Sequence, residues 1–139
     1  MRKHSVVAAA TLSAGLFAVA LGAQEAAPAQ HVKAMQDIRA AVQVFADFSR
    51  SQDFDAAAAA GTSARAAFQS VEQFWKERRD TEAAQQAAAG GRAAGDAAAA
   101  AGLRSAEGVT FAAEEMGATC MGCHTAHRIR REDGTFAIK

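Results

Sequence analysis

Near its C-terminus the 139-residue chain contains the segment "CMGCH", in which Cys120 and Cys123 are followed directly by His124. These two cysteines are the only ones in the sequence. Three kinds of site use such a pair: a disulfide, half of a zinc site, and the covalent attachment point of a c-type haem. The chemistry of the protein depends on which of the three is correct.

The first two alternatives lack features that they require. A redox-active Cys-x-x-Cys pair normally lies between a strand and a helix, and the sequence shows no strand–helix–strand pattern. A structural zinc site needs about four protein ligands, and the chain offers no second ligand pair away from this segment. Haem attachment uses both thiols, the two-residue spacing and the adjacent histidine. The segment therefore predicts one covalently attached haem c, with Cys120 and Cys123 as its anchors and His124 as an axial iron ligand.

The N-terminus predicts export. Arg2 and Lys3 precede an apolar run that ends in the small residues Gly22 and Ala23, which is the pattern of a secretory signal peptide. A retained membrane anchor is the alternative, because the run approaches the ~20 residues that span a bilayer. We expect cleavage after residue 23, a bacterial periplasmic location, one domain over residues 24–139, and no stable membrane insertion after cleavage.

Charge and composition narrow the choice of partners. The formal net charge of zero becomes −2 when the two positive charges of Arg2 and Lys3 leave with the signal peptide. Without a basic stripe, nucleic acid is not an expected partner. The alanine-rich, aromatic-poor sequence supplies small side chains and a modest core, which a large apolar cofactor would enlarge.

The mature chain shows the three-and-four spacing of amphipathic helices until its last few residues. We expect helices over about residues 29–50, 54–76 and 81–102, and a fourth that begins after Ser105 and carries the cysteine motif. Asp53 and Asp80 are placed to cap the second and third helices, whereas Gly90 and Gly91 leave a kink or loop open in the third. Four helices with short connections predict an all-α fold, an antiparallel up-down-up-down four-helix bundle.

In such a bundle the start of the first helix and the end of the fourth lie at the same end. Met35 belongs to the apolar face of the first helix, which also carries Ile38, Val42, Phe45 and Phe48. It therefore lies at the level of His124, and we expect it to be the second axial ligand of the iron. Two alternatives stay open: His31, one turn earlier, ligates instead, or Met35 only packs in the core and leaves the site open.

The motif "CMGCHTAHR" lies on the last helix and has Arg128 four residues after His124. In this respect the chain resembles the class II c-type cytochromes, the cytochrome c′ family. The resemblance implies a four-helix bundle with haem between the helices at one end, and Arg128 beside the proximal histidine or a haem propionate. In low-spin members a methionine near the start of the first helix ligates the iron, as expected for Met35. Family members also form dimers, so a homodimer stays open.

These features predict one-electron transfer to a redox partner protein through a transient contact. The alternative is a five-coordinate haem that binds nitric oxide or carbon monoxide. An enzyme is not expected, because His31 has no identifiable carboxylate partner for acid–base chemistry. Phe68, Phe74 and Trp75 are candidates for the haem wall, although an aromatic stripe at helical spacing is more often core. After a turn at Asp133-Gly134, we expect Phe136 and Ile138 to fold back over apolar surface near the haem end.

Overall fold

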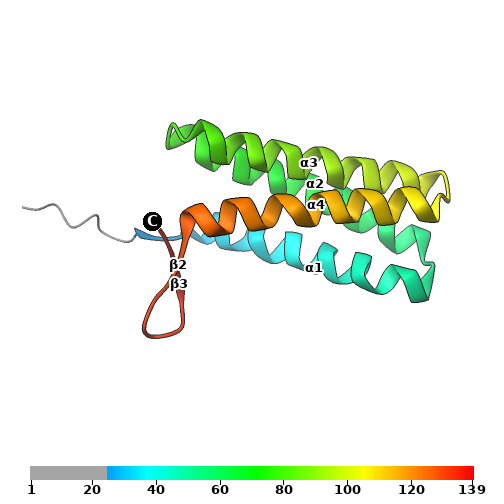
Figure 1. Cartoon of the computed structure of the whole chain (residues 1–139), viewed down its shortest axis with the longest axis horizontal. Helices are drawn as coiled ribbons and strands as arrows, with labels where there is room; N and C mark the ends of the chain where they lie inside the picture. The colour runs from blue at the N-terminus through cyan, green and yellow to red at the C-terminus, as the bar shows by residue number, and fades with distance from the viewer. Residues whose placement is uncertain (1–24) are drawn as a thin grey trace, which may run out of the picture.

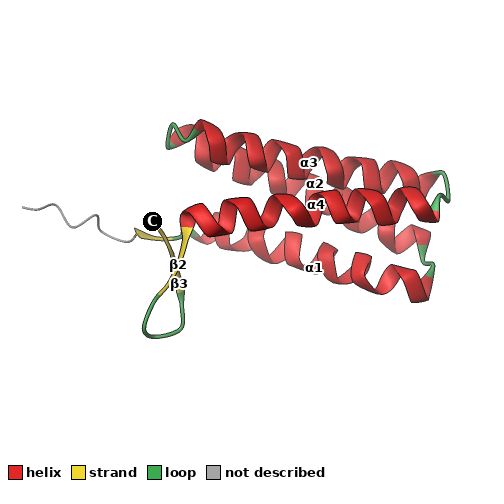
Figure 2. Ribbon diagram, viewed as in Figure 1, coloured by secondary structure: helices red, strands yellow, loops and turns green. Residues whose placement is uncertain are grey.

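The computed structural model describes residues 25–139, so the predicted signal peptide over residues 1–23 lies outside the described residues. Four helices follow one another: α1 (Ala29–Ser51), α2 (Phe54–Glu77), α3 (Thr81–Gly102) and α4 (Ala106–His127). They run up, down, up and down, so the start of α1 and the end of α4 lie at the same end of the bundle (Figure 1). The predicted fold class, a four-helix bundle, is confirmed (Figure 2).

Side-chain caps start three of the helices. The carboxylates of Asp53 and Asp80 accept hydrogen bonds from the backbone N–H of Ala56 at 2.9 Å and of Ala83 at 3.0 Å. The Ser105 hydroxyl does the same for the N–H of Gly108 at 3.2 Å, a longer bond. Each cap satisfies a donor that the first turn of a helix leaves without an intrahelical partner. These local signals explain why the predicted helix limits agree with the structure to within a residue or two.

Small residues let α2 and α3 pack more closely than any other helix pair. A methyl group added at Gly90 would lie 2.5 Å from the Phe68 ring, and one at Gly61 would lie 2.6 Å from the backbone oxygen of Ala94. The kink or loop left open at Gly90 and Gly91 does not occur, and α3 continues through both residues. The glycines instead make room for Phe68 at the helix–helix contact.

The buried face of α1 differs in part from the predicted one. Ile38, Phe45 and Phe48 are buried as predicted, but Met35 is half-buried and Val42 is 38 % exposed. The reason is that α1 contacts α4 less than any other pair of neighbouring helices in the bundle. Residues on the α4 side of α1 therefore face an open space rather than a packed core.

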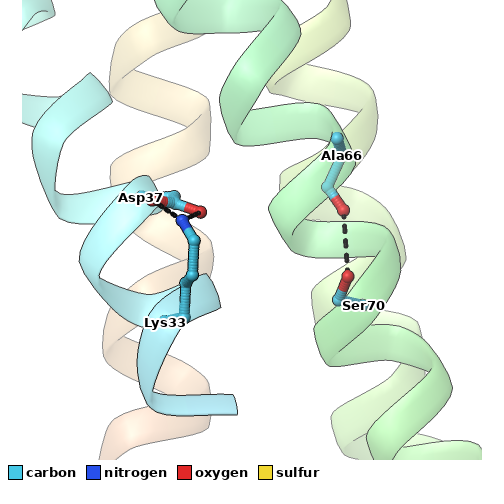
Figure 3. A network of polar contacts seen from close by, with 4 residues as sticks. All are labelled: Lys33, Asp37, Ala66 and Ser70. Atoms are coloured by element: carbon cyan, nitrogen blue, oxygen red, sulfur yellow. Dashed lines mark hydrogen bonds and ion pairs between the residues drawn. The ribbon is translucent and has the colours of Figure 1, made fainter. Parts of the chain in front are cut away.

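The solvent-exposed face of α1 carries an ion pair between side chains one turn apart. Figure 3 shows Lys33 donating to the carboxylate of Asp37, one turn later, with the charged nitrogen 2.8 Å and 2.7 Å from the two oxygens. The same view shows the Ser70 hydroxyl of α2 donating to the backbone oxygen of Ala66 at 3.4 Å. Each contact is local to its own helix, so neither joins that helix to a neighbour.

A small antiparallel sheet closes the end of the bundle where α1 begins. Its strands are β1 (Glu25–Ala26), β2 (Arg128–Arg130) and β3 (Phe136–Ile138), in the order β1-β3-β2. Ala137 is only 2 % exposed, and Lys139 donates its backbone N–H to the oxygen of His127 at 3.0 Å. The extended segment predicted after Asp133 is present, and it ties the C-terminus to the last turn of α4 (Figure 1).

Within residues 25–139, no helix has both the length and the apolar character needed to cross a membrane.

Candidate functional site

A cavity of about 560 Å³ lies between α1 and α4 at the end of the bundle that carries the sheet. This is within the range of about 300–1,000 Å³ that is usual for small-molecule and cofactor sites. Its walls come from α1, α4, one residue of α2 and the C-terminal strands. The lining residues are Ala27, His31, Val32, Met35, Gln36, Ile38, Arg39, Val42, Trp75, Gly117, Cys120, Cys123, His124, His127, Arg128, Phe136, Ala137 and Ile138. All five residues that the sequence singled out for the site (Cys120, Cys123, His124, Met35 and Arg128) are among them.

The wall formed by α4 holds both thiols and His124. Cys120 and Cys123 are free and half-buried, and Cys120 donates its S–H to the backbone oxygen of Met116 at 3.5 Å. Burial raises the pKa of both thiols; a hydrogen bond with Thr119 opposes the effect at Cys120. At Cys123 the Asp80 carboxylate adds to the effect. Both sulfurs are therefore protonated thiols at neutral pH.

The pKa of His124 is lowered, first by burial and then by the positive charge of Arg128. Its imidazole is therefore more often neutral than an exposed one, and neutral imidazole is the form that binds metals. Together with its position one residue after Cys123, this gives α4 two potential anchors and one potential metal ligand on a single wall.

The facing wall, formed by α1, holds Met35 and His31 one turn apart. Met35 is half-buried and packs partly against the hydrophobic core. Burial lowers the pKa of His31, and the charges of Arg78 and His124 lower it further.

The inner end of the cavity is aromatic. Trp75 of α2 is 4 % exposed, and its ring lies 4.6 Å from the ring of His127, centroid to centroid. His127 Nδ1 in turn lies 3.6 Å from a carboxylate oxygen of Asp80. Of the three aromatic candidates for the cavity wall, Trp75 lines this cavity, whereas Phe74 lines a separate pocket between α1 and α2. Phe68 does not line the cavity and packs against Gly90 of α3 instead.

The rim of the cavity is formed by the C-terminal strands. The Arg128 guanidinium lies over the Phe136 ring, 4.1 Å from its centroid. Phe136 is 49 % exposed, and Ile138 packs against the core. The predicted return of the tail to this end of the molecule is thus present, with Ala137 as its most buried residue.

Three of the large apolar side chains that the structure leaves exposed, Val32, Val42 and Phe136, line this one cavity. Exposed apolar side chains gathered around a concave site indicate an apolar occupant. The donor set agrees with a covalently attached haem. Two thiols can anchor the porphyrin, and His124 faces Met35 and His31 as potential axial ligands.

Over residues 25–139, no three or more His, Cys, Asp and Glu side chains gather as a group that could hold a metal ion. A structural zinc site takes about four protein ligands. A haem iron takes at most two, because the porphyrin supplies the other four. His124 on α4 and Met35 on α1, which both line the cavity, could supply those two ligands.

Sequence reasoning did not assign Arg39, Gln36 or Val32 to the site. All three lie on α1 beside Met35 and line the cavity. The signal that would have found Arg39 is its position four residues after Met35, on the same helix face. Val32 and Gln36 flank the predicted apolar stripe and carry no sequence signal of their own.

Comparison of the chain with models of protein families, with curated proteins and with solved structures finds no match in any of the three.

Proposed function

We propose that this chain is an exported monohaem c-type cytochrome that carries single electrons, built like the class II cytochromes that its motif resembles. The observation that carries the proposal is the shared cavity. Cys120, Cys123 and His124 come from the end of α4 and Met35 from the start of α1, yet all four line one space. A motif that occurred by chance in an alanine-rich helix would not be expected to face a methionine across an apolar cavity.

In this proposal the thiols of Cys120 and Cys123 hold the haem covalently. Each thiol would add across a vinyl group of the porphyrin, with its hydrogen going to the neighbouring vinyl carbon, so no electron would be gained or lost. The reaction needs reduced cysteines, and both are free thiols in the structure. His124 would hold the iron from the α4 side and Met35 from the α1 side.

Bound in this cavity, a haem supplies a one-electron Fe(III)/Fe(II) couple. The residues around it tune that couple and protect it. A neutral thioether ligand from Met35 favours the reduced state more than a second imidazole does. Ligands on both sides leave no iron position for a substrate, which agrees with electron transfer rather than catalysis. Trp75, which is 4 % exposed, would shield one wall of the cavity from water, and low polarity also raises the potential.

The proposed partners follow from the same geometry. Met121 lies between the two cysteines and is 68 % exposed, so the attachment edge of the site lies near the surface of α4. A redox partner protein would meet this edge in a small, transient contact. Nucleic acid is not proposed as a partner, and a homodimer is compatible with the fold. With residues 1–23 removed as a signal peptide, the protein would act in the bacterial periplasm, without stable membrane insertion.

A second candidate function is the binding of nitric oxide or carbon monoxide by a five-coordinate haem. One observation favours it: the Met35 side chain packs partly against the core, and a methionine that only packs would leave the iron open on the α1 side. The two candidates differ in the number of axial ligands.

One experiment tests both. The full chain is produced in a bacterial host that matures c-type cytochromes, and the mass and optical spectra of the purified protein are recorded. Electron transfer through His124 and Met35 predicts a mass increased by one haem that survives denaturation, a low-spin spectrum, and no rapid reaction of the reduced protein with carbon monoxide. A high-spin spectrum with rapid carbon monoxide binding supports the gas-binding candidate. A colourless protein with unmodified cysteines rules out both.

A further inference from the structure

His31 occupies an unusual position in the cavity wall. It lies one turn before Met35 on the same face of α1, where side chains four residues apart are neighbours. It lines the main cavity and also a second pocket of about 430 Å³ between α1 and α2. The imidazole therefore stands in the wall that separates the two spaces, beside the proposed ligand Met35.

The surroundings of His31 are aromatic rather than polar. Its ring lies 4.1 Å from the Phe74 ring, centroid to centroid, with 37° between the planes. The Trp75 ring is 6.1 Å away and nearly perpendicular, at 87°. Within the described residues, His31 Nδ1 is buried without a hydrogen-bond partner. Buried polar atoms almost always have a partner, so this nitrogen calls for an explanation, and a group bound in the cavity would provide one.

We propose that His31 is a reserve axial ligand, which binds the haem iron when the Met35 thioether is not bound. The inference rests on the proposed function, because it needs a haem in the cavity. In the exchange a neutral sulfur donor leaves and a neutral nitrogen donor binds, so neither an electron nor a proton is transferred. The contact with Phe74 stabilises the ring in the wall, which favours Met35 as the resting ligand.

Two observations support this assignment over a purely structural role for His31. The ring lines the cavity that holds His124 and Met35, and its buried Nδ1 has no hydrogen-bond partner among the described residues. The consequence would be protection of the site. Loss of the methionine ligand would lower the reduction potential, because imidazole favours the oxidised iron more than a thioether does, but would not open the iron to external ligands.

The test compares three variants of the full, haem-bearing protein. Met35→Leu removes the sulfur and nearly conserves the volume. Met35→Leu/His31→Phe also removes the imidazole but keeps a ring against Phe74. Met35→Leu/His127→Phe is the matched control, because His127 lines the same cavity from the His124 side. Spin state is read from optical and electron paramagnetic resonance spectra, and iron access from carbon monoxide binding to the reduced protein.

We expect Met35→Leu to remain low-spin with two imidazole ligands, at a lower potential, and to bind carbon monoxide slowly. Adding His31→Phe should convert it to a high-spin form that binds carbon monoxide rapidly, whereas adding His127→Phe should not. If Met35→Leu is already high-spin, or if it stays low-spin after His31→Phe, the proposal is wrong. A wild-type protein with His31 already bound to the iron would also overturn it, since Met35 would not be the resting ligand.

The outcomes that contradict the reserve-ligand proposal can be distinguished from those that contradict the proposed function. A wild-type chain whose mass lacks a haem overturns both, whereas a haem-bearing Met35→Leu variant without histidine ligation overturns the reserve ligand alone. Circular dichroism establishes that each variant is helical. Met35→Ala replaces Met35→Leu if the leucine variant does not fold.

Discussion

The interface between α2 and α3 is closely packed, whereas the interface between α1 and α4 contains a cavity. Between α2 and α3, glycine and alanine let the helices approach until a single added methyl at Gly90 would touch the Phe68 ring at 2.5 Å. Between α1 and α4, the helices stay apart and enclose a cavity of about 560 Å³ at one end. The first interface is complete in itself, because small side chains and Phe68 fill it. The second leaves Val32, Val42 and Phe136 exposed around a space, so we infer that it needs an occupant to be complete.

The small sheet links α1 and α4 at the end of their interface that holds the cavity. At the end near the cavity, α1 and α4 are joined indirectly, through the strand pairs β1–β3 and β2–β3. The sheet connects the beginning of the described chain to its end and lines the rim of the cavity with Ala137 and Ile138. A space between two helices lowers the stability of a bundle because side chains there lose packing contacts. The backbone hydrogen bonds of the sheet hold the start of α1 near the end of α4 and so oppose this loss.

The largest expected effect comes from removing the anchors of the open interface. Cys120→Ala/Cys123→Ala should abolish covalent haem and lower the free energy of unfolding by roughly 3 kcal/mol or more, because large apolar side chains lose their cover at about 1.5–3 kcal/mol each. Urea unfolding followed by circular dichroism measures the loss, and denaturing electrophoresis with haem staining measures attachment. Met121→Ala is the control, since Met121 is exposed between the cysteines and its loss should change neither. Equal stability of the double variant and wild type would show that the cavity needs no occupant.

One added methyl group should destabilise the close packing between α2 and α3. Gly90→Ala places a carbon against Phe68, and overpacking of this kind costs ~1–3 kcal/mol, more than alanine gains over glycine in a helix, ~1 kcal/mol. Urea unfolding should therefore show a less stable protein. Gly102→Ala, on the same helix, adds a methyl that meets nothing within 4 Å, so it should be neutral or stabilising by up to ~1 kcal/mol. If both variants are stabilised, α3 is not held tightly against α2.

Removing a helix cap should have a smaller effect on stability, and the effect should differ between the two ends of the bundle. Asp53→Ala removes only a cap, at a cost of ~1 kcal/mol. Asp80→Ala removes a cap of the same kind and also the carboxylate that lies 3.6 Å from His127 Nδ1 beside the cavity. We expect Asp80→Ala to be the more destabilising in thermal unfolding. Asp80→Asn, which can still cap but carries no charge, should recover the contribution of the cap and leave only the loss of the His127 contact. Equal losses for the two alanine variants would mean that the His127 contact contributes nothing.

The smallest effect is expected on the solvent face of α1 (Figure 3). Lys33→Ala removes an exposed ion pair with Asp37, and such pairs contribute ~0.3–0.5 kcal/mol. The loss in unfolding free energy should disappear in concentrated salt, which screens the pair. A loss above 1 kcal/mol, or one that does not depend on salt, would indicate that Lys33 has a second role.

Some features of this molecule are local, and the sequence predicted them well. Asp53, Asp80 and Ser105 cap helices because each needs only the backbone N–H three residues later. The proposed anchors and proximal ligand could be named from the sequence because Cys120, Cys123 and His124 lie within five consecutive residues. Met35 was placed at their level from helix order alone, and the structure puts it in the same cavity.

The tertiary structure decided what depends on partners distant in the chain. Val42 follows the same helical period as Ile38 and Phe45, and only the distance between α1 and α4 makes it line a cavity instead of the core. From the sequence alone Gly90 suggested a break in the helix, because glycine suits both loops and close helix packing. The structure shows that it makes room for Phe68 within a continuous α3. The pairing of β1 with β3 joins the two ends of the described chain. Local sequence could not predict this pairing, because β1 has only two residues and its partner strand lies at the other end of the described chain.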